Sequence, residues 1–302
     1  MDLSVILVNW NARALTEDAL RTLRAHTRGI TYEVFVVDNG SRDGSEPLQL
    51  AEQFPWVKVL RNPDNRGFSR ANNQALRRAR GRYLLLLNND TRQVENALGT
   101  AVTWMDAHPD VGALGITHLH DDGQTPQHSF FPFPDPWLDV QSLVGFMDGE
   151  PPAPDFVREQ DVDWLVGSFL MIRRNCYEDV GELDERFFVY DEDIDWCLRA
   201  RQSGWRICYS PCARMVHVGA ASKPHLKDKT FMHYRSHLAY LAKHHGSAAA
   251  AYYVAMSARL AASTGKQALR FLVGRARAED VQARLLRQRH FMTLGHGKAG
   301  VK

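Results

Sequence analysis

The segment Tyr83-Leu84-Leu85-Leu86-Leu87-Asn88-Asn89-Asp90 joins a fully apolar run to a polar, turn-forming cluster. A short, uninterrupted apolar run of this kind is typical of a strand that is buried on both faces. The same pattern occurs at Leu3–Val8, which Asn9 follows, and at Val34–Val37, which Asp38 follows. The sequence therefore predicts several buried strands that each end in a polar turn.

The stretches between these predicted strands have helical periodicity. They lie near residues 15–23, 48–54 and 72–80. Strands that alternate with helices predict an α/β fold with a mostly parallel sheet. Open sheets of this type bind their ligands at the carboxyl ends of the strands, where the polar turns lie.

The composition is that of an ordinary globular protein. The chain has 302 residues, of which 44% are hydrophobic and 24% charged, so disordered and fibrous classes are excluded. The formal net charge of +2 gives no reason to expect nucleic acid as a partner. The charge is uneven, because residues 266–302 carry nine Lys or Arg and two acidic residues. A basic tail therefore follows an acidic body.

The sequence shows no targeting or membrane-spanning segment. The N-terminus lacks the basic start of a secretory signal, and no stretch approaches the ~20 apolar residues of a spanning helix. We therefore expect a cytoplasmic protein whose four cysteines are reduced. Cys208 and Cys212 lack a second ligand pair of matching spacing, so we interpret them as core thiols rather than zinc ligands.

Asp38 is the first candidate for a nucleotide site. It ends a predicted strand and is followed by Asn39-Gly40-Ser41. Such a carboxylate can accept a hydrogen bond from a ring N–H of a nucleobase, but it can also cap the next helix. The sequence leaves both roles open. A Gly-x-Gly-x-x-Gly fingerprint is absent here, which argues against a dinucleotide site.

Asp90 is the first candidate for a metal site. It directly follows the apolar run, so a buried strand would fix its carboxylate at the sheet edge. Such a carboxylate suits a divalent cation that is bound by hard oxygen ligands together with a diphosphate. The alternative is that Asp90 caps a helix that begins near Val94.

A third cluster packs four carboxylates into five residues between aromatic side chains: Asp191, Glu192, Asp193 and Asp195. Like charges this close repel each other, so the pattern favours a cation or a proton-transfer task. The alternative for Asp191 and Glu192 is the first turn of a helix, where the helix dipole stabilises acids.

His217 follows a further short predicted strand. A lone histidine is usually a structural residue, and from the residues alone we give His217 no ligand role. The same interpretation applies to His118 and His120.

Together these clusters resemble the family 2 glycosyltransferases with the GT-A fold, and among them the bacterial rhamnosyltransferases. The matching segments follow the family's order over about residues 3–222. They are Val8-Asn9-Trp10-Asn11, Val37–Ser45, Asn65–Ser69 with Asn72-Asn73, Asn88-Asn89-Asp90, Gly167 with Arg173-Arg174, Gly181–Phe188, Glu192–Asp195 and His217. We therefore expect a GT-A catalytic domain over residues 1–245 and a basic helical C-terminal extension over residues 246–302.

The resemblance also implies roles for individual residues. Asp38 would hold the base of a nucleoside-diphosphate sugar, and Asp193 matches the general base, with Glu192 and Asp195 beside it. Asp90 and His217 match ligands of a divalent cation, Mn²⁺ or Mg²⁺. Many members carry an Asp where this chain has Asn88, so this site has one negative charge fewer. The residues implied to shape the donor pocket are Asn9, Asn65, Gly67, Phe68, Asn72, Asn88, Asn89 and Gly167.

The implied reaction is an inverting transfer of a sugar to a hydroxyl of a glycan or a lipid-linked acceptor, in cell-surface polysaccharide synthesis. The subgroup favours L-rhamnose from a dTDP-linked donor. Seven of the 13 prolines lie in Pro126–Pro154, which predicts an irregular loop that contacts the acceptor.

Two other functions stay open. One is a nucleotidyltransferase that makes a sugar nucleotide, although Asn9-Trp10-Asn11-Ala12-Arg13 is not the glycine-rich, basic loop that a triphosphate calls for. The other is a non-catalytic protein that binds sugar nucleotides. Hydrolysis of a sugar nucleotide with added Mn²⁺ or Mg²⁺ separates this last class from an enzyme.

The tail has an amphipathic pattern. Leu269, Leu272, Val273 and Ala276 recur at helical spacing beside several basic residues. Such a helix can lie on an anionic membrane, here the inner face of the cell membrane, where a lipid-linked acceptor is found. It can equally pack against the catalytic domain or against a second subunit of a homodimer, and the sequence leaves these possibilities open.

Overall fold

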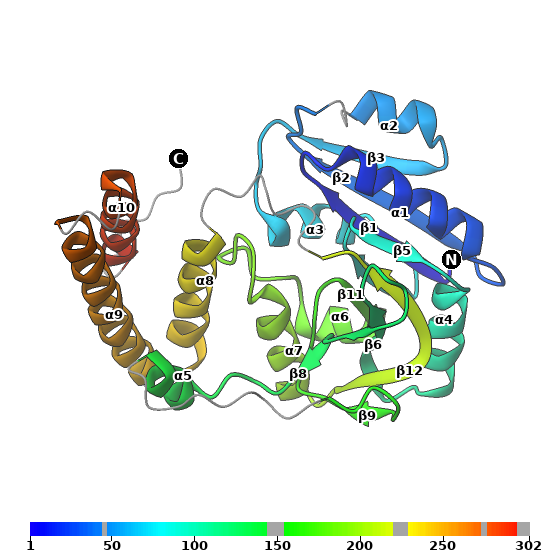
Figure 1. Cartoon of the computed structure of the whole chain (residues 1–302). Coiled ribbons are helices and arrows are strands. Elements are labelled where there is room, and N and C mark those ends of the chain that lie inside the picture. Colours follow the sequence, from blue (N-terminus) through cyan, green and yellow to red (C-terminus); the bar gives the residue numbers. More distant parts are fainter. Residues whose placement is uncertain (44–46, 144–153, 220–228, 273–276, 295–302) are drawn as a thin grey trace. The chain divides into compact units, whose positions relative to one another are not determined.

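The computed structural model describes residues 1–43, 47–143, 154–219, 229–272 and 277–294 (Figure 1). These residues form two compact units. The first comprises Met1–Phe133 with Ala153–Lys227, and the second comprises Pro134–Pro152 with Asp228–Lys302. The expected boundary at residues 245 and 246 lies inside the second unit, because α8 (Lys229–His244) packs against α9 (Gly246–Leu272).

One mixed sheet forms the centre of the first unit. Its strands lie in the order β3 (Val57–Asn62), β2 (Tyr32–Asn39), β1 (Leu3–Asn9), β4 (Tyr83–Leu87), β11 (Phe169–Arg173), β6 (Val111–Leu119), β12 (Arg206–His217) and β5 (Thr91–Gln93). Strands β3, β2, β1 and β4 are parallel, and so are β6 and β12. Strand β11 runs antiparallel to both of its neighbours. The predicted α/β fold with a mostly parallel sheet is confirmed, and along this order of strands β11 and β5 are the antiparallel members.

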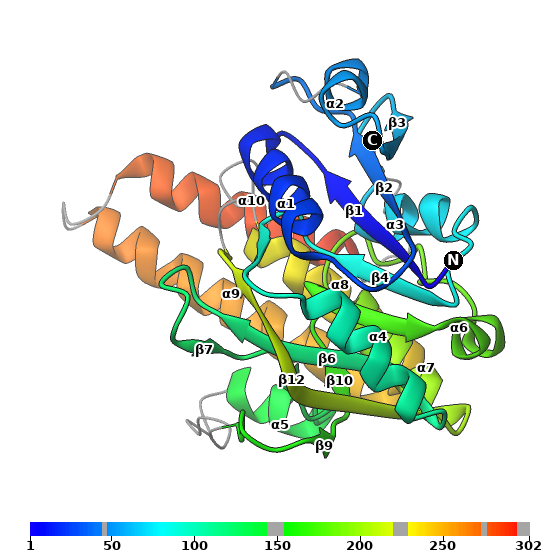
Figure 2. The same ribbon diagram turned by 90° about the vertical axis from the view of Figure 1, so that its right-hand side faces the viewer.

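Helices cover both faces of this sheet. Figure 2 shows α1 (Arg13–His26) and α4 (Ala97–Ala107) on one face. The other face is covered by α3 (Phe68–Leu76), α6 (Arg174–Val180) and α7 (Glu192–Gln202). A further short helix, α2 (Pro47–Gln53), packs beside β3.

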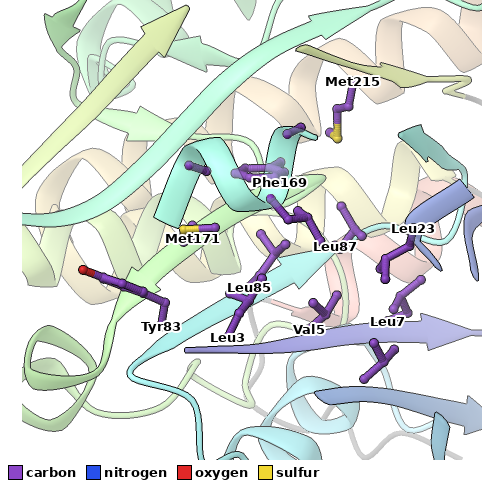
Figure 3. Close-up of a cluster of buried hydrophobic side chains, with 14 of the residues drawn as sticks. Leu3, Val5, Leu7, Leu23, Tyr83, Leu85, Leu87, Phe169, Met171 and Met215 are labelled. Atoms are coloured by element: carbon purple, nitrogen blue, oxygen red, sulfur yellow. The ribbon is translucent and has the colours of Figure 1, made fainter. Parts of the chain in front are cut away.

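Side chains of each strand alternate between the two faces, as the strand geometry requires. In β1, Leu3, Val5 and Leu7 enter the cluster under α1 and α4, which Figure 3 shows, whereas Ile6 enters the cluster on the other face. Burial on both faces explains why the strands are continuous apolar runs in the sequence. All four cysteines are free thiols, and three of them are buried.

The described part of the proline-rich stretch Pro126–Pro154 contains two short strands where the sequence predicted an irregular loop. Strand β7 (Pro126–Gln127) pairs with β6, and β8 (Phe130–Phe131) pairs with β10 (Trp164–Leu165), which lies after the stretch. Another short strand after the stretch, β9 (Gln160–Asp161), pairs with β12. Residues 144–153 of the stretch lie outside the described residues.

The second unit consists of helices in the described residues. Helix α9 packs against α5 (Pro136–Leu143), α8 and α10 (Ala278–Leu294). The predicted helical C-terminal region is therefore confirmed, but α9 ends at Leu272. Val273 and Ala276 of the predicted amphipathic pattern lie outside the described residues. Within the described helices, none is both long and apolar enough to span a bilayer.

Candidate active site

A network of buried polar side chains lies at the carboxyl ends of β1, β2 and β4. Asn9 Nδ2 donates to Asp38 Oδ1 and to Ser41 Oγ, both at 3.1 Å. Asn9 Oδ1 accepts from Thr16 Oγ1 at 2.8 Å and from Asn89 Nδ2 at 3.4 Å. Both ends of the Asn9 amide are paired. Asn89 therefore holds Asn9, and Asn9 in turn holds Asp38.

Asp38 is 1% exposed, and burial raises the pKa of its carboxyl group, against hydrogen bonds from Ser41 and Asn9 that lower it. The next helix begins at Pro47, so Asp38 is not its cap. A carboxylate held in this way at the end of a strand can accept a ring N–H of a base.

The turn before α3 is fixed by Asn39 and Asn65. Asn39 Nδ2 donates to Asn65 Oδ1 at 2.8 Å, and the same oxygen accepts from the Gly67 N–H at 3.0 Å. Gly67 has φ +87°, and a Cβ there would lie 2.6 Å from the Phe188 carbonyl oxygen. The Phe68 N–H donates to that same carbonyl at 2.6 Å. Asn65, Gly67 and Phe68 therefore shape this turn and join it to the segment before α7.

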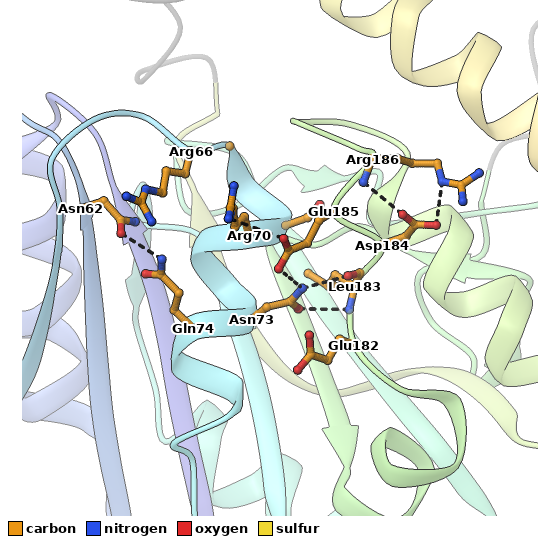
Figure 4. Close-up of polar contacts among 12 residues, drawn as sticks. Asn62, Arg66, Arg70, Asn73, Gln74, Glu182, Leu183, Asp184, Glu185 and Arg186 are labelled. Atoms are coloured by element: carbon orange, nitrogen blue, oxygen red, sulfur yellow. Dashed lines mark hydrogen bonds and ion pairs between the residues drawn. The ribbon is translucent and has the colours of Figure 1, made fainter. Parts of the chain in front are cut away.

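Polar side chains of α3 extend the same connection (Figure 4). Asn73 Nδ2 donates to the Leu183 carbonyl at 2.9 Å, and Asn73 Oδ1 accepts from the Leu183 N–H at 3.1 Å. Ser69 Oγ donates to the Phe187 carbonyl at 2.7 Å. Asn72 donates to the Phe68 carbonyl, but its buried Oδ1 has no partner among the described residues. Helix α3 thus holds the segment before α7 in place.

Asp193 lies in the first turn of α7. Its Oδ2 accepts from the Gly167 N–H at 2.9 Å, and its Oδ1 accepts from the Ile194 N–H at 2.9 Å. Burial raises the pKa of Asp193 to about 6, although the Gly167 hydrogen bond lowers it. Tyr190 and Asp191 both have positive φ, 72° and 64°, so the chain turns sharply just before the helix. Asp193 is therefore a positioned carboxylate that titrates near neutral pH, as a general base requires.

The two neighbouring acids differ from Asp193. Glu192 is 5% exposed, and burial together with the charge of Asp193 raises its pKa well above the ordinary value. Its Oε2 has no partner within the described residues. Asp195 is fully buried and accepts from Arg199 Nε at 2.9 Å. Since Arg199 also donates to the Val180 carbonyl, Asp195 anchors α7 to the preceding loop.

Asp90 and His217 meet at the edge where β4 and β12 end. His217 Nε2 lies 3.3 Å from Asp90 Oδ1, and the Val218 N–H donates to the Asp90 carbonyl at 2.9 Å. Asp90 is followed by β5 and not by a helix, and Asn96 precedes α4, so the capping alternative for Asp90 is not observed.

The donor atoms of this pair suit a divalent cation. His217 Nδ1 lies 2.7 Å from Gln127 Oε1, and because an amide oxygen only accepts, Nδ1 carries the hydrogen. Nε2 is then the ring atom that faces Asp90 Oδ1, and these two atoms could bind one cation. An imidazole whose other N–H is held by an oxygen is typical of metal ligands. The described residues contain no group of three or more His, Cys, Asp and Glu side chains that could hold a metal ion.

Two consecutive residues, Gly167 and Ser168, join Asp193 to the turn that precedes Asp90. The Gly167 N–H binds Asp193, and the Ser168 carbonyl accepts from the Asn88 N–H at 3.1 Å. Gly167 and Asn88, which the family resemblance placed in the donor pocket, therefore contribute their backbone N–H groups to the site. Sequence reasoning missed Ser168, Thr16 and Gln127, because their roles depend on strand pairing that local patterns do not encode.

Comparison with known proteins identifies the fold and the family. The family model named Glycosyl transferase family 2 matches residues 4–181. The chain belongs to glycosyl transferase family 2. This glycosyltransferase is 27% identical over 248 residues to the N-acetylglucosaminyl-diphospho-decaprenol L-rhamnosyltransferase of Mycobacterium tuberculosis, a match that covers 73% of this chain and 77% of that protein.

A second relative is the O-antigen biosynthesis protein RfbC of Myxococcus xanthus, 30% identical over 224 residues. That match covers 68% of this glycosyltransferase but 17% of the relative, so the chain spans less than a fifth of that protein's length. The resemblance to rhamnosyltransferases stated from the sequence is thus confirmed.

Among solved structures, the mannosyltransferase from Pyrobaculum calidifontis in complex with GDP-Man and Mn²⁺ has the same fold. The TM-score is 0.56 at 20% identity, over 97% of this chain and 85% of that one. The fold is therefore that of the GT-A glycosyltransferases.

Proposed function

We propose that this enzyme transfers L-rhamnose from a dTDP-linked donor to a hydroxyl of a glycan or lipid-linked acceptor, with inversion, in cell-surface polysaccharide synthesis. One observation carries the proposal. The consecutive residues Gly167 and Ser168 contact Asp193 and the backbone of Asn88, which lies two residues before Asp90, so the carboxylate proposed as the base lies near the turn that carries Asp90. The activity in the name of the mycobacterial relative supports rhamnose as the sugar.

In this mechanism Asp193 removes the acceptor proton. The hydroxyl oxygen attacks the anomeric carbon, the bond from that carbon to the diphosphate breaks, and the proton moves to an Asp193 oxygen. With its pKa near 6, Asp193 is mostly ionised at neutral pH and ready to accept. Burial and the charge of Asp193 raise the pKa of Glu192, which favours Asp193 as the anion of this pair. A single displacement inverts the anomeric centre.

The other site residues bind the donor. Asp38, held by Asn9 and Ser41, accepts the ring N–H that thymine and uracil share. Asp90 and His217 would hold a divalent cation, Mn²⁺ or Mg²⁺, which when bound neutralises charge on the departing diphosphate.

The test is a thermal-shift panel combined with a transfer assay. A ligand that binds the folded state raises the apparent Tm, so dTDP-rhamnose should shift it more than GDP-mannose. Release of dTDP with Mn²⁺ and an acceptor supports the proposal. Formation of a sugar nucleotide from dTTP and a sugar phosphate would indicate a nucleotidyltransferase, and binding without turnover would indicate a non-catalytic protein.

We further propose that the second unit contacts an anionic membrane surface, at the inner face of the cell membrane. It carries exposed apolar side chains on α5, α9 and α10, namely Trp137, Leu138, Val254, Leu269, Leu285 and Leu286. Exposed Lys266 and Arg270 lie beside Leu269 on α9. Basic and apolar groups together favour binding to anionic lipid.

Vesicle co-sedimentation tests this contact. Binding to anionic vesicles should exceed binding to neutral ones, and a variant carrying Lys266→Glu and Arg270→Glu should lose it. A variant carrying Arg61→Glu and Arg78→Glu, two exposed residues of the first unit, makes the same change in charge and is the matched control. Equal binding to both vesicle types, or none, contradicts the proposal, and a homodimer in sedimentation velocity would assign the apolar surface to a second subunit.

A further inference from the structure

His118 is a buried histidine beside the cation pair that the mechanism above does not use. It lies on β6 and is 1% exposed. Its Nδ1 lies 3.3 Å from Ser168 Oγ, whereas its Nε2 is buried and has no hydrogen-bond partner in the described parts of the chain. The centre of its ring lies 5.9 Å from that of His217.

An unpaired buried nitrogen is costly, and a phenylalanine at this position would avoid the cost. When Nδ1–H donates to the Ser168 hydroxyl, Nε2 carries a lone pair. A neutral imidazole nitrogen with its other N–H occupied is an available metal ligand.

Gln127 supports the same assignment. It lies directly opposite His118 in the register of β6 and β7, and its Oε1 accepts from His217. One strand pair therefore carries both the group that orients His217 and the second imidazole.

We propose that Nε2 of His118 is a third ligand of the divalent cation, beside Asp90 and His217. This rests on the proposed function only in its use of a cation. The three side chains are not yet close enough to hold an ion, so the rings must move together when it binds. Imidazole nitrogens bind metals at about 2.1 Å, and each ring centre lies about 1.2 Å behind its nitrogen. Two rings at a right angle on one ion therefore have centres about 4.7 Å apart, so the observed 5.9 Å requires a shift of about 1 Å.

The third ligand makes up for a missing one. Asn88 stands where an acidic ligand is expected, and a neutral imidazole provides a donor atom there without restoring the charge. A site with two imidazoles and one carboxylate favours Mn²⁺ or Co²⁺ over Mg²⁺, which prefers oxygen ligands.

The test measures Mn²⁺ binding in the full-length protein without any sugar donor. In the wild type, pulsed electron paramagnetic resonance of bound Mn²⁺ should show couplings to two imidazole ¹⁴N nuclei, and His118→Phe should show one. The Kd for Mn²⁺ should rise about tenfold or more in His118→Phe. His120→Gln, an exposed histidine two residues away, should bind Mn²⁺ like the wild type. A wild-type spectrum with a single imidazole coupling overturns the proposal even if no variant folds.

Thermal shifts separate a ligand from a histidine that holds a buried water. If His118 is a ligand, the Tm of His118→Phe without metal should equal or exceed that of the wild type. The increase in Tm on adding Mn²⁺ should then be mostly lost. If His118 only holds a buried water, Mn²⁺ should raise the Tm of His118→Phe as much as that of the wild type. This result would overturn the proposal. If the wild-type protein binds Mn²⁺ through two imidazoles but does not transfer rhamnose, the proposed function is wrong while the metal ligand stands.

Discussion

Two parts of the candidate site differ in how their buried polar atoms are paired. We call the part around Asp38 the nucleotide edge and the part around Asp193, Asp90 and His217 the catalytic edge. At the nucleotide edge, the amides of Asn9 and Asn89 and the hydroxyl of Thr16 bind one another and hold Asp38. At the catalytic edge, Glu192 Oε2 and His118 Nε2 are buried without partners in the described residues. Under the proposed function, the network around Asn9 and Asp38 is a preformed part of the donor pocket. Glu192 and His118, like Asn72 of that pocket, keep buried polar atoms that a bound ligand could pair.

The largest effect is expected from removing the base of the catalytic edge. Asp193→Asn keeps the size of the side chain and an oxygen that can accept from Gly167, but it cannot take up a proton. Turnover should therefore fall by ~10² or more while donor affinity survives. Steady-state transfer rates and donor titrations measure both quantities.

Asp191→Asn is the matched control for Asp193→Asn. Asparagine tolerates the left-handed conformation of position 191, so the turn should survive and the rate should change little. A collapse of turnover in Asp191→Asn with a normal rate in Asp193→Asn would move the base two residues upstream.

The next effect concerns the cation pair. Asp90→Ala should lower transfer by more than about tenfold without unfolding the protein, and EDTA should abolish transfer until Mn²⁺ or Mg²⁺ is restored. Circular dichroism checks the fold of the variant. Full activity in EDTA would remove the metal from the mechanism.

A pH profile tests the burial of Asp193. Because burial raises its pKa to about 6, kcat/KM should fall about tenfold per pH unit below that value. The same pKa shift makes the folded protein less stable as pH rises, whereas activity increases. The unfolded chain releases this proton near pH 4 and the folded protein releases it near pH 6, so Asp193 lowers the free energy of unfolding as pH rises from about 4 to 6. Denaturation of the wild type and Asp193→Asn across this range measures that contribution, and a flat kcat/KM down to pH 5 would contradict the assignment.

The smallest effects are on stability and compare paired with unpaired buried groups. Thr16→Val leaves Asn9 Oδ1 and Asn89 Nδ2 with fewer partners and should cost about 1–3 kcal/mol. Gln93→Leu removes a buried amide with both ends unpaired among the described residues, so it should be neutral or stabilising. Urea unfolding of both variants decides this, and equal losses would show that pairing is not the cause.

Local sequence patterns predicted most of the elements but not how they meet. The apolar run Tyr83–Leu87 is β4 itself, because a strand buried on both faces must be apolar throughout. Nothing in the pattern of Phe169–Arg173 reveals that it enters the sheet antiparallel, between β4 and β6. Periodicity records burial and does not record strand direction.

The candidate site shows the same limit. The polar ends of β1, β2 and β4 could be expected to meet, since parallel strands end at one edge. The contact between Asp90 and His217 joins residues far apart in the chain, and the orientation of His217 by Gln127 depends on a two-residue strand. Local sequence patterns do not predict such long-range contacts, which were found through the family resemblance or the structure.

The antiparallel insertion of β11 has a consequence during synthesis on the ribosome. β4 pairs with β1 on one side, but its other partner begins at Phe169, about 80 residues later. At ~5–20 residues per second the nascent chain carries four leucines on an unpaired strand edge for several seconds. Such an edge invites pairing with other chains. Chaperone-depleted translation should therefore yield aggregates seeded by the first 90 residues, before any catalytic residue of α7 has been made.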